Sequence, residues 1–311
     1  MEIYHHLNEI PQDKKLVLAI GFFDGCHRGH QVVFEKVRSL AREKGALPGV
    51  LTFFPHPMTI LAPSIRVPLL QSEEEKVVSL KKAGMKLSLF IRPDQAFLSE
   101  STEAFMKKLA SLDGLLGLVV GENFTFGKGA LGNSESLLSY FKDSRVTVNI
   151  VKLAEGKGAP FSSTRIREEI LSGHMEEAAR LLGRPYTMQG DVVHGFRRGH
   201  EVLGFPTANL SFREDRVLPP DGVYATRARV NGKRYDAITN IGTNPTFGNT
   251  ERTIETFIFH FEESIYGKPF TLEWVSRLRG EKKFESFEAL KAQIAVDIRQ
   301  AEKVLGTSGK W

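Results

Sequence analysis

An apolar run that ends in a glycine-containing turn constrains the fold of this chain more than any other feature. Leu16–Phe23 reads LVLAIGFF, and the overlapping turn GFFDGCHRGH continues directly into the helical pattern GHQVVFEKVRSLAREKG. A strand that ends in such a turn and opens a helix presents unpaired backbone N–H groups and a positive dipole end to an anion. Gly25 and Gly29 allow the backbone to approach a phosphate without an intervening Cβ. The segment therefore predicts a phosphate-binding strand–turn–helix unit.

Strand and helix patterns alternate along the rest of the first half. Further apolar runs read PGVLTFF, LSLFI, LLGLVVG and VTVNIVKL, and helical patterns between them include Thr102–Leu112 and Ser134–Phe141. Ser72 and Glu75 form a capping-box pattern before another helix, EEEKVVSLKKAG. The alternation predicts an α/β domain whose parallel sheet is covered by helices on both faces. Ligands of such sheets bind at the carboxyl ends of the strands, where GFFDGCHRGH and the later GENFTFGKG lie.

Two short helical patterns, SSTRIREEILSG and HMEEAARLLG, close the first half. Gly173 and Gly183 stand at their ends, where glycine commonly terminates a helix, and Pro185 follows. The hydrophobic pattern changes beyond this point. We therefore expect two domains, formed by residues 1–184 and residues 185–311.

Apolar and polar residues alternate through most of the second half. The alternating runs read YTMQGDVV, GVYATRARV, KRYDAITNIG, TIETFIFHF and TLEWVSRLR. Asn231–Gly232, between two of these runs, is a strong signal for a two-residue hairpin. Apolar residues from Phe287 to Leu305 then repeat at helical spacing. The pattern predicts a small antiparallel β-barrel with a terminal helix packed on it.

Composition excludes several classes of protein. The single cysteine, Cys26, rules out a disulfide framework and is typical of the reducing cytosol. No apolar run approaches the ~20 residues of a membrane span, and the N-terminal MEIYHHLNEIPQDKK has no apolar leader. We therefore expect a cytoplasmic protein that binds no membrane. The net charge of +5 favours anionic partners, but no basic–aromatic stretch is present, so phosphorylated small molecules are favoured over nucleic acid.

Two segments carry residues suited to binding phosphate. His27 and His30 can both donate to phosphate oxygens as charge develops, although structural or surface histidines are the alternative interpretation. In FSSTRIR, Ser162 or Ser163 is a candidate N-cap, so hydroxyl and N–H groups point out of a helix start beside two arginines. An ordinary capped amphipathic helix is the alternative. Two such helix starts in one α/β domain favour a nucleotide site.

Two further loops lie at the same sheet edge. GENFTFGKGALGN carries Phe124 and Phe126, on which a planar ligand could stack, and Asn123, which could hydrogen-bond to it. In TFFPHP the two prolines restrict the turn, and His56 either touches a ligand or is a structural histidine. The alternative for the first loop is a plain surface loop.

The second half carries a different set of polar groups. Thr207 and Asn209, in GFPTANL, offer the oxygen ligands that suit Mg²⁺. Glu255 lies on a predicted strand, where alternation places it opposite Ile254 and Thr256, and its carboxylate could act as a general base. A solvent-facing strand residue is the alternative. The segment GDVVHGFRRGHEVLG supplies a loop able to fold over a polyphosphate.

These motifs together resemble those of the prokaryotic bifunctional riboflavin kinase/FAD synthetase family, over essentially the whole chain and in the same order. GFFDGCHRGH and SSTRIR resemble the nucleotide signatures of the adenylyltransferase half, and GENFTFG resembles its flavin and ATP loop. GFPTAN, NIGTNPTF and the strand with Glu255 resemble the kinase half. The resemblance implies a Rossmann-like nucleotidyltransferase domain and a kinase barrel. It also implies phosphorylation of riboflavin to FMN, adenylylation of FMN to FAD, and ATP and Mg²⁺ as requirements.

The resemblance also implies a role for individual residues. The expected catalytic residues are His27, His30, Asn123 and Glu255. The expected ATP-binding residues are Gly21, Phe23, Asp24, Gly25, Ser162, Ser163, Thr164, Arg165, Arg167, Gly204 and Pro206. The expected flavin-binding residues are Phe54, His56, Phe124 and Phe126, and the expected metal ligands are Thr207 and Asn209. The expected partners are flavins and ATP alone, and the sequence leaves the oligomeric state open.

The chain departs from the family pattern at three places. Pro160 stands where the family often has a basic residue, so Arg165 is a candidate to replace that phosphate contact. Asn123 stands where many members have aspartate, and the segment Gly199–Gly204 is one residue longer than the common form. Two other functions stay open: a kinase whose first half is a scaffold, and a non-catalytic flavin-sensing or RNA-binding regulator.

Overall fold

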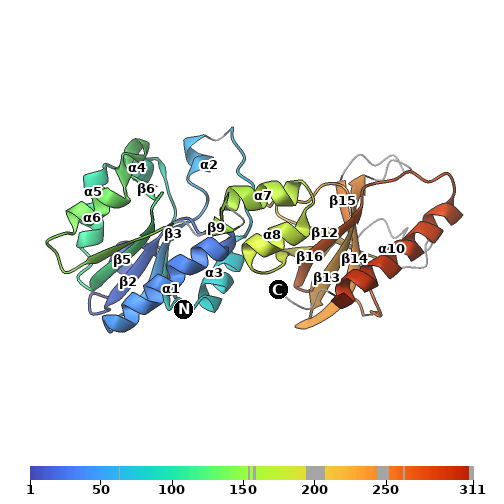
Figure 1. Cartoon of the computed structure of the whole chain (residues 1–311), viewed down its shortest axis with the longest axis horizontal. Helices are drawn as coiled ribbons and strands as arrows, with labels where there is room; N and C mark the ends of the chain where they lie inside the picture. The colour runs from blue at the N-terminus through green and yellow to red at the C-terminus, as the bar shows by residue number, and fades with distance from the viewer. Residues whose placement is uncertain are drawn as a thin grey trace. The chain divides into compact units, whose positions relative to one another are not determined.

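The computed structural model describes residues 1–62, 64–152, 155–156, 159–193, 207–243, 252–261 and 263–307. Its contacts divide the chain into two compact units, Met1–Ser163 and Thr164–Trp311. Figure 1 shows the chain with its helices and strands labelled.

A six-stranded parallel sheet forms the centre of the first unit. Its strands, in spatial order, are β1 (Glu2–Tyr4), β4 (Leu87–Ile91), β3 (Leu47–Phe53), β2 (Leu16–Ile20), β5 (Leu115–Gly121) and β8 (Thr147–Val151). All the pairings between neighbours are parallel. The predicted parallel sheet is confirmed. The three-residue edge strand β1 was not predicted, because it is too short to show a period.

Alternate residues of β2 enter two different hydrophobic cores. Leu18 and Ile20 pack in a cluster with buried residues of α5 (Thr102–Ala110) and α6 (Ser134–Tyr140). Val17 and Ala19 pack in a second cluster, with residues of α1 (Arg28–Glu43) and α3 (Glu73–Lys82). Successive side chains of a strand point to opposite faces, so helices cover both faces of the sheet, as predicted (Figure 1).

The remaining elements of the first unit are short. They are η1 (Leu7–Glu9), η2 (Asp24–Cys26), α2 (Met58–Leu61), α4 (Gln95–Leu98), β6 (Thr125–Phe126), η3 (Lys128–Ala130), β7 (Gly132–Asn133), β9 (Glu155–Gly156) and β10 (Ala159–Pro160). The predicted capping box of α3 is confirmed: Ser72 Oγ accepts from the N–H of Glu75 at 3.2 Å, and the Glu75 carboxylate accepts from the N–H of Ser72 at 2.9 Å. These bonds start α3 at a defined residue.

The second unit contains a closed antiparallel barrel. Around the barrel, the strands are β11 (Tyr186–Val193), β12 (Thr207–Ser211), β15 (Arg252–Ile258), β14 (Lys233–Thr243), β13 (Gly222–Val230) and β16 (Phe270–Arg279). Asn231 and Gly232 have φ values of 51° and 77° between β13 and β14, as a type I′ hairpin requires. The predicted barrel and hairpin are both confirmed.

A long terminal helix, α10 (Phe287–Thr307), packs on the outside of the barrel (Figure 1). Its Ala301 and Leu305 join one buried cluster with Val223, Ala225 and Val275 of the strands. The guanidinium of Arg279 also donates to the buried Asp297 carboxylate at 2.8 to 3.1 Å. The predicted terminal helix is therefore confirmed.

The helices α7 (Ser163–Leu171) and α8 (Met175–Leu182) lie at the junction between the units. α8 ends at Gly183, whose φ of 79° is the left-handed conformation that the sequence predicted for a helix end. α8 contacts β11 and β16 of the barrel, so the contacts group α8 with the second unit. The boundary between residues 184 and 185 stays a prediction. It assigns both helices to the first domain, whereas the contacts group them, apart from Ser163, with the second unit.

We predict that the barrel depends on α8 for stability. Leu181 of α8 is fully buried, whereas Leu171 at the end of α7 is 53% exposed. Leu181→Ala should lower the free energy of unfolding by about 2–5 kcal/mol because it leaves a cavity, and Leu171→Ala should change it by less than about 0.5 kcal/mol. The measurement is thermal unfolding of the fragment Thr164–Trp311, which contains all of α8 and all of α7 apart from its first residue, Ser163. Equal melting temperatures for the two variants would mean that the barrel begins at residue 185 as an independent unit.

Candidate active sites

The turn after β2 has an unusual backbone. Phe23, Gly25 and Cys26 have φ values of 53°, 81° and 42°, in the left-handed region that glycine adopts freely and other residues adopt rarely. Gly21 precedes them, and a Cβ on it would lie 2.9 Å from the ring of Phe23. Left-handed non-glycine residues persist only where surrounding contacts hold them. The turn must therefore be braced from outside.

Asp24 supplies much of that bracing. Its carboxylate is 1% exposed and accepts from the main-chain N–H groups of Leu70 at 3.1 Å and of Gln71 at 3.2 Å. Its main-chain oxygen accepts from the Ser163 hydroxyl at 2.9 Å. Asp24 therefore ties the turn to the segment before α3 and to the start of α7, and its predicted contact with ATP stays a prediction.

The two predicted histidines lie together at the start of α1. The rings of His27 and His30 stack with centroids 3.6 Å apart and planes at 22°. The Phe23 ring meets His30 edge-on, with centroids 5.2 Å apart. A Cβ on Gly29 would lie 3.1 Å from the His27 ring and 3.2 Å from Cβ of Phe161, so a larger residue would require one of these neighbours to shift by a few tenths of an ångström. The two histidines are thus neighbours in space, and their contact with phosphate stays a prediction.

The environment of His30 keeps its imidazole neutral. Burial lowers the pKa of His30 well below its usual value, and the neighbouring His27 and Lys76 lower it further. Nδ1 of His30 is buried and has no hydrogen-bond partner among the residues that the structure describes. Buried polar atoms are normally hydrogen-bonded, so this ring nitrogen is suited to a ligand.

Lys76 of α3 is a site residue that was not predicted from the sequence. Its side chain is fully buried, and Nζ donates to the main-chain oxygens of Phe22 at 2.8 Å and Phe53 at 3.3 Å. Burial lowers the pKa of Lys76 to about 8, against the opposing effects of Asp24, Cys26 and Glu73. Only the fold reveals this lysine, because it lies in an ordinary amphipathic helical pattern.

The predicted flavin-binding residues fall on two segments. Phe54 is buried, and it precedes Pro55 through a cis peptide bond. The His56 ring packs on Phe22 with centroids 4.3 Å apart, and its Nδ1 accepts from the N–H of Met58 at 3.1 Å. These contacts also satisfy the structural interpretation of His56, so its contact with flavin stays a prediction.

The predicted loop Gly121–Asn133 is more ordered than a plain surface loop. It folds into the two-stranded β6–β7 hairpin, in which the rings of Phe124 and Phe126 stack 5.5 Å apart. Phe126 is buried and also packs on Phe105 of α5, so it serves the core, whereas Asn123 is exposed. A cavity of about 430 Å³ lies beside this loop and is lined by Glu122, Asn133, Ser134, Glu135, Ile150 and Lys152.

The remaining residues of the second signature follow along α7. Ser162 precedes the helix and Ser163 begins it, and capping of the helix by either hydroxyl stays a prediction. Thr164 is exposed, and Arg167 is half-buried. Arg165 pairs with Glu177 at 3.1 Å, so part of its charge is neutralised before it could replace a missing phosphate contact.

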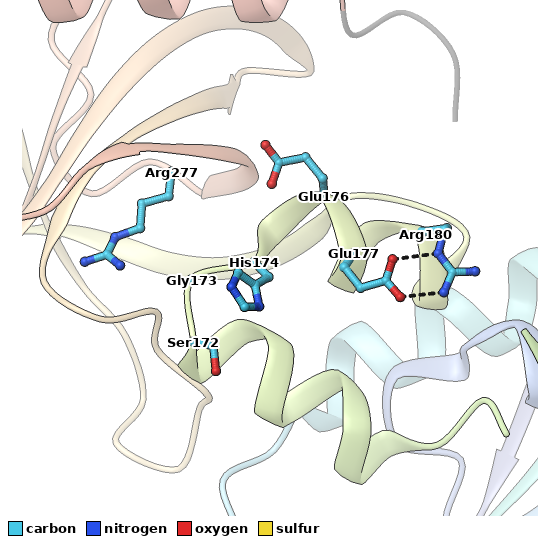
Figure 2. Close-up of a pocket in the computed structure, with 7 residues that line it drawn as sticks. All are labelled: Ser172, Gly173, His174, Glu176, Glu177, Arg180 and Arg277. Atoms are coloured by element: carbon cyan, nitrogen blue, oxygen red, sulfur yellow. Dashed lines mark hydrogen bonds and ion pairs between the residues drawn. The ribbon is translucent and has the colours of Figure 1, made fainter. Parts of the chain in front are cut away.

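A cavity of about 700 Å³ in the second unit lies outside the predicted sites. Figure 2 shows its lining residues, which are Ser172, Gly173, His174, Glu176, Glu177, Arg180 and Arg277. Glu177 faces Arg180 across two hydrogen bonds, drawn as dashed lines, and it also pairs with Arg165. The acidic and basic groups of this cavity largely compensate each other.

The predicted kinase residues meet on the barrel through strand register. Asn209 of β12 pairs with Glu255 of β15, and Glu255 pairs on its other side with Asn240 of β14. Directly paired residues share a face of a sheet, so these three side chains form a row. Thr207 lies two residues along β12 on the same face. Gly204 and Pro206 lie outside the described residues.

The opposite face of β15 belongs to the barrel core. Ile254, Thr256 and Ile258 are buried, whereas Glu255 is half-buried, as the predicted alternation requires. Asn240 was not predicted as a site residue. It lies in NIGTNPTF, and only the register between β14 and β15 places it beside Glu255.

We predict that the free energy of unfolding of the first unit depends on pH through the titration of Lys76. The folded-state pKa of about 8 is below the ordinary 10.5, so the unfolded chain binds more protons between these pH values. The wild type should gain stability relative to Lys76→Met as pH rises through this window, by about 1.4 kcal/mol per unit of pKa depression. Denaturant unfolding at pH 7, 8, 9 and 10 measures the difference. The exposed Lys81→Met, on the same helix, is the control that should show no such trend.

Parallel stability curves for the wild type and Lys76→Met would contradict a depressed pKa for this lysine. Below pH 8 the two curves should run at a constant separation, because both states of the wild type are then protonated.

Comparison with protein families covers both units. A model of the FAD synthetase family matches residues 9–165, and a model of the riboflavin kinase family matches residues 182–305. The described residues contain no helix that is both long and apolar enough to cross a membrane.

Curated relatives and a solved structure match almost the whole chain. The chain is 38% identical to the bifunctional riboflavin kinase/FMN adenylyltransferase of Listeria monocytogenes, over 92% of this chain and 91% of the relative. The protein of the same description from Bacillus subtilis is 35% identical, over 96% and 94%. A crystal structure from Streptococcus pneumoniae titled as a macrolide-efflux protein has a TM-score of 0.88 and 32% identity, over 96% of this chain and 98% of that one. With its two family domains in this order, the chain belongs to the bifunctional riboflavin kinase/FMN adenylyltransferase family.

Proposed function

We propose that this chain makes FAD from riboflavin in two ATP-dependent steps. The barrel transfers the γ-phosphoryl group of ATP to riboflavin, which gives FMN and ADP. The first unit then joins FMN to the adenylyl group of a second ATP, which gives FAD and pyrophosphate. The observation that carries the proposal is the presence of two separate sets of polar groups, the stacked His27–His30 pair and the Asn209–Glu255 pair, on two folded units of one chain.

The adenylyl step needs no protein nucleophile. A phosphate oxygen of FMN attacks the α-phosphorus of ATP, and the bond from that phosphorus to the bridging oxygen of pyrophosphate breaks. Catalysis is then positioning and stabilisation of charge. His27 and His30 donate hydrogen bonds to phosphate oxygens, and Ser163, Thr164 and Arg167 bind the ATP phosphates.

The kinase step needs a base and a way to hold the triphosphate. The Glu255 carboxylate accepts the proton of the terminal ribityl hydroxyl, whose oxygen forms the new bond to the γ-phosphorus as ADP leaves. The half-buried position of Glu255, on the barrel face that carries Asn209, supports this role.

The same face suits Mg²⁺. A hydroxyl oxygen from Thr207 and an amide oxygen from Asn209 are hard donors, and a site with few protein ligands is typical of Mg²⁺, which keeps waters and substrate phosphates. Among the described residues no cluster of three or more histidine, cysteine, aspartate or glutamate side chains could hold a metal, so a site that depended on carboxylates or imidazoles has no counterpart there. Bound Mg²⁺ would neutralise charge on the phosphates.

Two alternatives from the sequence are less well supported. A scaffold role for the first unit does not require two stacked histidines or a buried ring nitrogen without a partner. A non-catalytic regulator does not require a carboxylate paired with Asn209 on the outer face of the barrel. The direct test is to incubate the protein with riboflavin, ATP and Mg²⁺ and to separate the flavins by chromatography. FMN and FAD should both appear, and the absence of both would refute the proposal.

We further propose a cytoplasmic location. Cys26 is a buried thiol that is not part of a disulfide, which is compatible with a reducing compartment, and ATP is available there.

We predict that the two activities can be removed separately. His30→Ala should lower the rate of FAD formation by about 10²–10³, the usual cost of one such donor, while riboflavin is still converted to FMN. Glu255→Gln keeps the size of the side chain but removes the base, so it should block FMN formation and still allow FAD formation from supplied FMN. Chromatography of the products measures both. If either variant lost both reactions while still folded, the assignment of two sites would be wrong.

We also predict that kinase activity depends on the Thr207 hydroxyl. Thr207→Val removes the oxygen at nearly unchanged volume, so riboflavin phosphorylation should collapse while FAD formation from FMN persists. Thr207→Ser keeps the hydroxyl and should retain most of the kinase activity. The measurement is initial rate against Mg²⁺ concentration. If Thr207→Val kept the wild-type kinase rate, the metal site would have to lie elsewhere.

A further inference from the structure

Lys76 is buried more completely than lysine usually is. None of its side chain is exposed, although it belongs to a helix whose neighbouring Lys81 and Lys82 lie in solvent. The ammonium group lies 3.9 Å from the centroid of the Phe22 ring, a cation–π distance, and it donates to two main-chain oxygens. A buried ammonium is retained against its desolvation cost only where such partners surround it.

The two carbonyl groups that Lys76 holds lie at the carboxyl ends of neighbouring strands. Phe53 is the last residue of β3, and Phe22 lies two residues beyond the end of β2. The Phe22 oxygen also accepts from the Thr52 hydroxyl at 3.0 Å. Lys76 therefore joins the histidine turn to the TFFPHP segment at the sheet edge where ligands of parallel sheets bind.

The Phe22 carbonyl controls the residue that packs on His30. A peptide unit is planar, so fixing this oxygen also fixes the direction of the N–H of Phe23. Phe23 has a positive φ of 53°, and its ring meets His30 edge-on. A chain of direct contacts thus runs from Lys76 through Phe22 and Phe23 to His30.

Asp24 gives an independent hold on the same turn. Its carboxylate accepts from Leu70 and Gln71, which lie just before α3, whereas Lys76 reaches the turn from the second turn of that helix. Asp24 holds the turn after Phe23, and Lys76 holds it before Phe23. Loss of Lys76 would therefore leave the turn attached through Asp24 and the Phe22 carbonyl bonded to the Thr52 hydroxyl, but it would remove the bridge between the Phe22 and Phe53 carbonyls.

We propose that Lys76 is a positioning residue of the adenylyl-transfer site, which holds the Phe22 and Phe53 carbonyls together and thereby sets the position of Phe23 against His30. This inference rests on the proposed adenylyltransferase activity of the first unit. It assigns Lys76 no contact with substrate.

Because Lys76 titrates, the proposal implies that the rate of FAD formation depends on pH in a way that the kinase rate of the barrel does not. The groups that interact with it are Asp24 and Cys26 of the turn, Glu73 of its own helix and His30 of α1. Since the pKa of Lys76 is about 8, the ammonium becomes a neutral amine as pH rises through this value. The amine can still donate hydrogen bonds, but it loses the charge that strengthens them and the contact with the Phe22 ring.

The test compares Lys76→Met with the exposed Lys81→Met in the full chain. We expect kcat for FAD formation from FMN to fall about 10²-fold in Lys76→Met, as for a small misplacement of reacting groups. KM for ATP should change much less. The kinase rate of the same chain should be unchanged, which is the internal control for concentration and folding of the second unit, and Lys81→Met should match the wild type in both reactions.

Two further measurements keep the proposal falsifiable if Lys76→Met does not fold. Lys76→Gln retains a donor without charge, and it should recover part of the lost kcat. The wild-type kcat for FAD formation should also fall as pH rises through about 8. The pH profile of a folded Lys76→Gln should lack this fall. A folded Lys76→Met with wild-type kcat would overturn the proposal, as would a Lys76→Gln profile identical to the wild type when Lys76→Met is unfolded.

Discussion

Asp24 joins three segments that are far apart in the sequence: the turn after β2, the residues before α3 and the start of α7. Its buried carboxylate accepts from Leu70 and Gln71, and its carbonyl accepts from Ser163. Loss of the carboxylate would leave two buried N–H groups unsatisfied, at about 1–3 kcal/mol each. The left-handed residues Phe23 and Cys26 need such external contacts. The turn that precedes both histidines therefore depends in part on this acidic side chain.

The adenylyl site combines basic side chains with a dry environment. Burial lowers the pKa of both His30 and Lys76, so each of these groups loses its positive charge at a lower pH than its residue type indicates. The phosphates of ATP would bring negative charge next to these groups and favour their protonated forms.

The two-residue period of the barrel strands gives β15 one face in the barrel core and one face with the polar residue Glu255. One face of β15 supplies Thr256, whose hydroxyl hydrogen-bonds to that of Thr239 at 2.9 Å inside the core. The other face supplies Glu255, between Asn209 and Asn240. A substitution of Glu255 would therefore leave the threonine pair of the core in place, although the face of Glu255 also carries Phe257, which packs on the cluster beside α10.

Local patterns in the sequence determined the parallel sheet, the barrel, the hairpin at Asn231–Gly232 and the helix end at Gly183, because periodicity and turn chemistry act over a few residues. They also placed His27 and His30 at a strand–turn–helix junction. The tertiary structure alone decided that Lys76 lies under that turn, that Asp24 binds main-chain N–H groups and that Asn240 lies beside Glu255. These relations depend on strand register and on contacts between residues tens of positions apart, and no local period in a chain encodes either.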